Sequence, residues 1–128
     1  MDIKPLTRAL SVSGQITHGD VSKIAALGFK TIINNRPDSE ISRQPRTKTL
    51  AAHAKKYGIN YIYLPVISGQ MTQDNIDDFA ALLAEKKGPV LAFCRTGTRS
   101  ANLWAGANPD KLAANEITRI GAAAGYTI

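Results

Sequence analysis

Short apolar runs alternate along the chain with longer stretches in which apolar residues recur at helical spacing. The short runs are rich in β-branched and aliphatic residues, which favours strands. They are predicted at residues 9–13, 29–34, 59–66 and 88–93. Apolar residues three and four positions apart predict amphipathic helices between and after these strands. The helices are expected from Thr17 to Gly28, from about Thr47 to Gly58, from Thr72 to Gly88, at residues 100–107 and at about 115–124.

Polar caps and glycines support these boundaries. Thr17 followed by Asp20 has the spacing of a capping box, and Gly28 supplies the stop of the same helix. Residues 35–46 contain two prolines and several polar turn formers, which predicts a loop.

Strands separated by helices predict an α/β fold with a mostly parallel sheet and helices on both faces. With 128 residues, the chain is expected to form a single domain, residues 1–128. Functional loops of such sheets lie at the carboxyl ends of the strands. This rule places residues 36–38, 68–69 and 94–99 on one rim.

The amino-acid composition indicates the class of protein and its cellular compartment. Hydrophobic residues make up 44% of the chain and charged residues 20%, as in ordinary soluble domains. No apolar run approaches the roughly 18 residues that a membrane span needs, and the first residues lack the shape of a secretion signal. Cys94 is the single cysteine and has no partner for an internal disulfide, so we expect a cytoplasmic protein without a membrane partner.

The net charge of +6 favours an anionic partner. Aromatic residues are only 6% and are not interleaved with basic stripes, which argues against nucleic acid. The arginines instead gather in two places: Arg36, Arg43 and Arg46 in one loop, and Arg95 and Arg99 beside the cysteine. We therefore expect an anionic small-molecule substrate or a phosphorylated one.

Cys94 ends an apolar strand and is followed by a glycine-containing turn that opens a helix. Backbone N–H groups of such a turn converge on an anion, and the helix N-terminus adds its positive end. The same field favours a thiolate over a thiol. A lone cysteine is often an inert core residue, but Arg99 and Ser100 directly after the turn favour a reactive nucleophile.

Each residue of this loop has an expected role. The N–H groups that form the cradle belong to Arg95, Thr96, Gly97, Thr98 and Arg99. A phosphate or sulfate ion fits such a cradle, and the Arg99 guanidinium can grip two of its oxygens. Gly97 permits close backbone approach. Ser100 is placed to hydrogen-bond the Cys94 sulfur or to cap the helix.

Two residues of the second rim loop are further candidates. Asp38 could supply a general acid, or it is a turn former or an ion-pair partner. Glu40 is a weaker candidate for the same general-acid role. Arg36 could give a second grip on phosphate or sulfate, or pair with Asp38 or Glu40. His18 and His53 have no metal-binding spacing, so neither a metal nor a cofactor is expected.

Residues 94–100 resemble the active loop of cysteine-dependent phosphatases and of rhodanese sulfurtransferases. Together with residues 10–17, 28–38, 63–66 and 122–126, in that order, they are similar to one bacterial family. It is the phosphatase-like domain family of beta-lactamase-hydrolase-like proteins, also labelled a candidate sulfur transferase. The resemblance implies a fold like that of dual-specificity phosphatases and a Cys-Arg active loop.

The residues of the cysteine loop are compatible with two reactions, phosphate hydrolysis and sulfur transfer. Tyrosine and dual-specificity phosphatases place five residues between cysteine and arginine, whereas four separate Cys94 from Arg99. Phe93 stands where those enzymes usually have histidine, and no acid follows the third strand. These departures favour a rhodanese-like Cys94 persulfide. The order of motifs favours a phosphatase-like hydrolase with a covalent Cys94 intermediate, which is the first hypothesis; a non-catalytic anion-binding module is the third.

Overall fold

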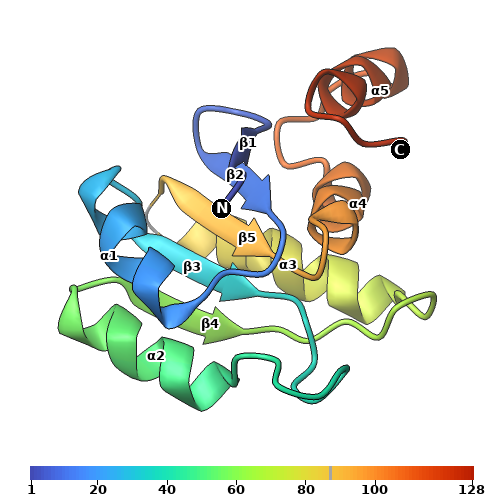
Figure 1. Ribbon diagram of the computed structural model, residues 1–128. Coiled ribbons are helices and arrows are strands. Elements are labelled where there is room, and N and C mark those ends of the chain that lie inside the picture. Colours follow the sequence, from blue (N-terminus) through green and yellow to red (C-terminus); the bar gives the residue numbers. More distant parts are fainter. Residues whose placement is uncertain (87) are drawn as a thin grey trace.

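The computed structural model describes residues 1–86 and 88–128. Its centre is a five-stranded sheet with the strand order β1-β2-β5-β3-β4 (Figure 1). The strands are β1 (Lys4–Pro5), β2 (Leu10–Ser13), β3 (Thr31–Asn34), β4 (Asn60–Tyr63) and β5 (Val90–Phe93). β1 pairs antiparallel with β2, and all other pairs are parallel. The predicted mostly parallel sheet is confirmed.

Helices cover both faces of the sheet, as predicted (Figure 1). Their bounds are α1 (His18–Ala26), α2 (Thr47–Lys56), α3 (Gln73–Glu85), α4 (Thr98–Ala107) and α5 (Ala114–Ala123). Buried residues of α1 and α2 share one hydrophobic cluster with the sheet, and those of α3, α4 and α5 share the other. The fold is that of a three-layer α/β protein.

Strand β5 lies in the middle of the sheet and is buried on both faces. Its side chains alternate, so Leu91 and Phe93 pack with α1 and α2, whereas Val90 and Ala92 pack with the other helices. All four residues are buried. An entirely apolar run is therefore what this central position requires.

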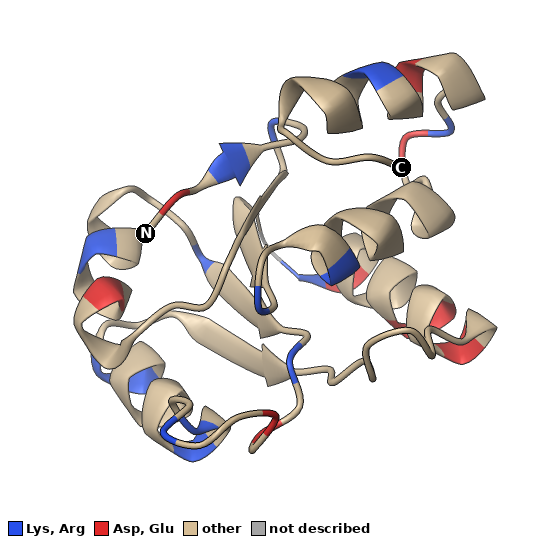
Figure 2. Ribbon diagram, turned by 45° about the vertical axis from the view of Figure 1, so that its right-hand side comes forward, with Lys and Arg blue, Asp and Glu red and all other residues tan. Residues whose placement is uncertain are grey.

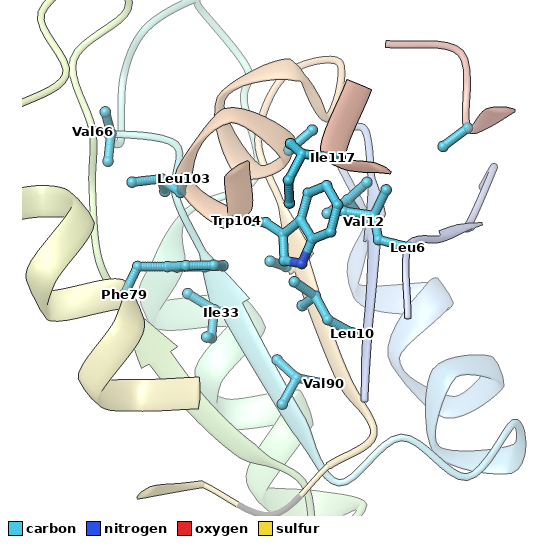
Figure 3. Packing of buried hydrophobic residues seen from close by; sticks show 13 residues of the cluster. Leu6, Leu10, Val12, Ile33, Val66, Phe79, Val90, Leu103, Trp104 and Ile117 are labelled. Carbon is cyan, nitrogen blue, oxygen red and sulfur yellow. The ribbon is translucent and has the colours of Figure 1, made fainter. Parts of the chain in front are cut away.

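The larger cluster joins α3 and α4 to the sheet. Figure 3 shows Phe79 of α3 and Trp104 of α4 beside Ile33 of β3. Phe79 and Trp104 are among the largest fully buried side chains. This packing fixes the position of α4, and α4 begins at the loop that follows the cysteine.

The strands are shorter than predicted, and one was missed. β4 ends at Tyr63, before Leu64 and Pro65, because proline has no N–H group for a sheet hydrogen bond. It is an edge strand whose residues are exposed or half-buried. The two-residue β1 was not predicted, because Lys4 and Pro5 carry no apolar strand pattern.

The helix boundaries agree closely with the sequence pattern. Asp20 accepts the Thr17 N–H at 2.9 Å, and Thr72 accepts the Asn75 N–H at 3.1 Å, as N-terminal caps do. Helix α4 begins at Thr98, two residues earlier than expected. The part of the chain between Lys86 and Gly88, where the third predicted helix was expected to end, lies outside the described residues.

The register aligns the carboxyl ends of the four parallel strands. Ser13 and Asn34 lie level with Phe93 on either side of it, and Tyr63 lies level with Asn34. The loops that follow these strands therefore emerge from one edge, which is where ligands bind in open parallel sheets. Cys94 follows the central strand of this edge.

No helix in the described residues is long and apolar enough to span a membrane.

We predict that Phe79→Ala destabilises the protein by about 3–5 kcal/mol, because it removes a fully buried ring from the contact of α3 with the sheet. The control is Leu27→Ala, whose side chain is 63% exposed and whose effect is expected within about 0.5 kcal/mol. Urea unfolding measures both. Equal effects of the two variants would contradict the packing described for this cluster.

Candidate active site

Cys94 lies directly after β5 and is 1% exposed. The N–H group of Gly97 donates a hydrogen bond to its sulfur at 3.1 Å. Gly97 is also the N-cap residue of α4, so the sulfur faces the positive end of a helix. A backbone N–H group and a helix N-terminus are both suited to contact negative charge.

Position 97 requires glycine for two reasons. Its φ angle is +94°, which side chains rarely tolerate. A Cβ atom there would also collide with the hydroxyl of Tyr126. That hydroxyl donates a hydrogen bond to the carbonyl of Thr96 at 3.2 Å. Tyr126, three positions beyond the end of α5, thus contacts the cysteine loop.

Arg99, in the first turn of α4, is held by two loops. Its Nη1 and Nη2 atoms donate to the two carboxylate oxygens of Glu40, at 2.7 and 2.9 Å. Its Nη1 also donates to the carbonyl of Val66 at 2.9 Å. Glu40 lies in the loop after β3 and Val66 in the segment after β4, so three strand ends meet at one guanidinium.

The contacts with Glu40 and Val66 use three of the five N–H groups of the Arg99 guanidinium. The remaining two, on Nε and Nη2, lie on one edge of the planar group and form a fork that matches two oxygens of an anion. The Cys94 thiolate contributes to raising the pKa of Arg99, after the larger effect of Glu40. The guanidinium is therefore close enough to Cys94 to interact with it.

Glu40 bridges two arginines. One of its oxygens accepts from Arg99 and also from the Nε atom of Arg36 at 2.8 Å. The hydrogen bond from Arg99 is the main cause that lowers the pKa of Glu40 to about 2, with Arg36 adding to it against burial. Glu40 is thus ionised at neutral pH and serves as a fixed anionic support.

Arg36 is itself buried, at 2% exposed. Besides Glu40 it contacts the side-chain carbonyl of Gln15 at 3.0 Å, which brings in the loop after β2. The structure therefore shows Arg36 paired with Glu40, one of the two alternatives for this residue. It does not line the cavity beside the cysteine loop.

Ser100 does not have the sulfur contact considered for it. Its hydroxyl donates to the side-chain oxygen of Asn35 at 2.8 Å, and both residues are buried. Asn35 in turn donates to the carbonyl of Leu64 at 3.0 Å. Since Ser100 lies two positions inside α4, its hydroxyl ties that helix to the loops after β3 and β4 rather than to Cys94 or the helix N-terminus.

A cavity of about 520 Å³ opens beside the cysteine loop. One wall comes from that loop and α4, and the opposite wall from the segment between β4 and α3. The lining residues are Ile67, Ser68, Gly69, Met71, Arg95, Thr96, Thr98, Arg99 and Asn102. It is large enough for an anionic group together with an organic substituent.

Asp38 is not among the residues that line this cavity. Its carboxylate accepts the N–H of Thr47, the first residue of α2, at 2.9 Å. Its own N–H donates to the hydroxyl of Tyr63 at 2.8 Å. The structure thus places Asp38 in a turn, which was one of its alternatives, and its carboxylate contacts the start of α2, a role that was not expected.

Charges are distributed unevenly over the molecule. Figure 2 shows lysine and arginine without acidic residues on α2, aspartate and glutamate without basic residues on α3, and residues of both signs on α1. Arg95 and Arg99 are the charged residues of the cavity lining. The cavity therefore has a locally positive potential that suits an anion.

Comparison with known proteins agrees with this geometry. The profile of the family described as "Beta-lactamase hydrolase-like protein, phosphatase-like domain" matches residues 2–111. The chain belongs to this family. A beta-lactamase hydrolase-like protein of Xylella fastidiosa strain Temecula1 is 32% identical over 130 residues, covering all of this chain. The chain spans only 30% of that relative's length.

Solved structures show the same fold. A candidate phosphatase from Neisseria meningitidis Z2491 is 36% identical, with a TM-score of 0.88, and the match covers 99% of this chain and 91% of that one. The catalytic domain of the S. cerevisiae phosphatase SIW14 is 14% identical, with a TM-score of 0.64 over 94% of this chain and 83% of its own. This phosphatase-like domain therefore has the cysteine-phosphatase fold.

The sequence pattern of this phosphatase-like domain located the loop but missed its supports. Gln15, Asn35, Val66 and Tyr126 were noted only as parts of the family motifs. Glu40 was considered only as a weak candidate acid. For Gln15, Asn35 and Glu40 a further signal was their position after predicted strands, since those loops share an edge.

We predict that Glu40→Gln lowers stability at pH 7 by about 1–3 kcal/mol, because two partly buried guanidinium groups lose their counter-charge. The pKa of Glu40 is lower in the folded state, so its contribution is fully present above about pH 4.5 and is lost as pH falls towards about 2. The difference between the variant and the wild type should therefore shrink over this range.

Urea unfolding at pH 7, 4 and 3 measures that difference. Glu116→Gln is the matched control, because it breaks an exposed pair with Arg119 on α5 and should leave the midpoint nearly unchanged. A difference for Glu40→Gln that stays constant with pH would contradict the support assigned to its carboxylate.

Proposed function

We propose that this protein is a cysteine-dependent hydrolase of phosphate esters, with Cys94 as nucleophile. The observation that carries the proposal is the pairing of the sulfur with two groups that suit an anion. Gly97 donates its N–H to the sulfur, and Glu40 holds Arg99 so that the Nε and Nη2 edge of the guanidinium is used by neither Glu40 nor Val66.

In the first step the Cys94 thiolate attacks phosphorus, and the bond from phosphorus to the leaving oxygen breaks. The leaving oxygen keeps the electron pair, and a phosphocysteine forms. In the second step water attacks the phosphorus, sulfur leaves as thiolate, and the proton of the water passes to solvent. Inorganic phosphate is the product, and neither a metal nor a cofactor takes part.

The remaining loop residues bind the phosphoryl oxygens. We assign this role to backbone N–H groups of Arg95, Thr96 and Thr98, together with the Nε and Nη2 edge of Arg99, while Gly97 keeps its N–H on the sulfur. Phosphate or sulfate would occupy the same place. The yeast phosphatase with this fold was crystallised in complex with citrate, also an anion, which supports an anionic ligand for this protein. The single free cysteine suits a reducing compartment, so we place the reaction in the cytoplasm.

Sulfur transfer is the second candidate. The specific observation in its favour is the short loop, with four residues between Cys94 and Arg99. In this reaction the thiolate would attack the outer sulfur of thiosulfate, the sulfur–sulfur bond would break, and sulfite would leave with the electron pair. Cys94 would then carry a persulfide.

We expect the protein to hydrolyse p-nitrophenyl phosphate and the Cys94→Ser variant to lose that activity by at least about 1000-fold, since the hydroxyl is not ionised at neutral pH. The companion assay is thiosulfate:cyanide sulfur transfer with the same two proteins. If Cys94-dependent sulfur transfer is faster than Cys94-dependent phosphate hydrolysis, the protein is a sulfurtransferase and not a phosphatase. If the protein binds phosphate but catalyses neither reaction, it is a non-catalytic anion-binding module.

A further inference from the structure

We infer that the site acts on phosphoryl compounds whose leaving group departs without a proton from the protein: aryl phosphates, acyl phosphates and phosphoanhydrides. The inference rests on the proposed function and names its substrate class. It is carried by the absence of an available acid around the cavity, which the following contacts establish within residues 1–86 and 88–128.

The cavity lining has no Asp, Glu or His among its described residues. Its polar groups are hydroxyls, an amide and two guanidiniums, which hold their protons too tightly to protonate a leaving oxygen at neutral pH. The wall opposite the cysteine loop is partly apolar. Ile67 is 58% exposed there and stands beside Met71. This wall suits the aromatic or apolar part of a leaving group.

The two carboxylates of the neighbouring rim loop, those of Asp38 and Glu40, already accept hydrogen bonds from other groups of the protein. Asp38 accepts the N–H of Thr47 at the start of α2 and does not line the cavity. Glu40 contacts Arg36 and Arg99, and these contacts keep it ionised, with its pKa at about 2. Glu40 therefore has no proton to give at neutral pH.

Tyr126 is a further acidic group near the cysteine loop. Its hydroxyl proton is directed to the carbonyl of Thr96. Burial raises the pKa of Tyr126, with the Cys94 thiolate adding to this effect, so the phenol holds its proton more firmly. Tyr126 therefore supports the loop and does not serve as the acid.

Proton donation in such a reaction typically contributes about 100- to 10,000-fold to the rate. Without it, the leaving oxygen bears the full negative charge as its bond to phosphorus breaks. The first step is then fast only for oxygens that are stable as anions, such as those of a nitrophenolate, a carboxylate or a phosphate. Alkyl phosphates, which release alkoxides, become poor substrates.

The test compares kcat/KM for p-nitrophenyl phosphate with kcat/KM for phenyl phosphate. The parameter kcat/KM reports the first step, in which the phenolate leaves. We expect phenyl phosphate to be slower by about 100-fold or more, and an alkyl phosphate to be slower still. Acetyl phosphate should be hydrolysed at least as well as p-nitrophenyl phosphate. Values of kcat/KM for the two aryl phosphates within about tenfold of each other would overturn the inference.

Asp38→Asn is the discriminating variant, because asparagine keeps an acceptor for the Thr47 N–H and removes the proton-donating group. We expect the ratio between the two aryl phosphates to be the same in this variant as in the wild type. A selective loss of kcat/KM for phenyl phosphate would identify Asp38 as the acid and overturn the inference.

Failure of the proposed function is separable from failure of this inference. If p-nitrophenyl phosphate is hydrolysed no faster by the wild type than by Cys94→Ser, the nucleophile assignment falls. If hydrolysis depends on Cys94 but the leaving group has little effect, only the substrate class is wrong.

Discussion

The carboxylate of Glu40 holds the guanidinium groups of Arg36 and Arg99, and the geometry of the cysteine loop depends on this contact. A guanidinium on a long side chain has many rotamers, and freezing it costs conformational entropy. Arg99 donates two hydrogen bonds to Glu40 and a third to the carbonyl of Val66, and together these select one orientation. That orientation leaves one edge of Arg99 without these partners, and it is this edge that an anion can use.

The fold makes this contact possible through strand register. β2, β3, β4 and β5 end level with one another, so the segments after them meet at one edge. Each contributes one support: Gln15 on Arg36, Glu40 on Arg99, the Val66 carbonyl on Arg99, and Gly97 on the sulfur. Cys94 itself follows β5, the central strand, whose four residues are all buried. Binding groups carried by a rigid sheet need little reorganisation when a substrate arrives.

Local features of the fold could be predicted, and contacts between distant segments could not. The cysteine loop is contiguous in sequence, so its strand, its glycine turn and its helix show in the order of residues 88–100. The contact of Glu40 with Arg99 joins residues 59 positions apart, and that of Ser100 with Asn35 joins residues 65 apart. The spacing of apolar residues along the sequence predicts helices and strands, but it does not predict contacts between residues so far apart. For the same reason Asp38 looked equally suitable as an acid and as a turn residue until its contact with Thr47 was known.

The most direct test of the account is a crystal structure of the protein with vanadate or sulfate in the cysteine loop. We expect two oxygens of the anion to accept hydrogen bonds from Nε and Nη2 of Arg99, while Glu40 keeps its contacts with the same guanidinium. An anion that displaces Glu40 from Arg99, or one that binds outside residues 94–99, would contradict the claim that Glu40 orients Arg99 towards the substrate.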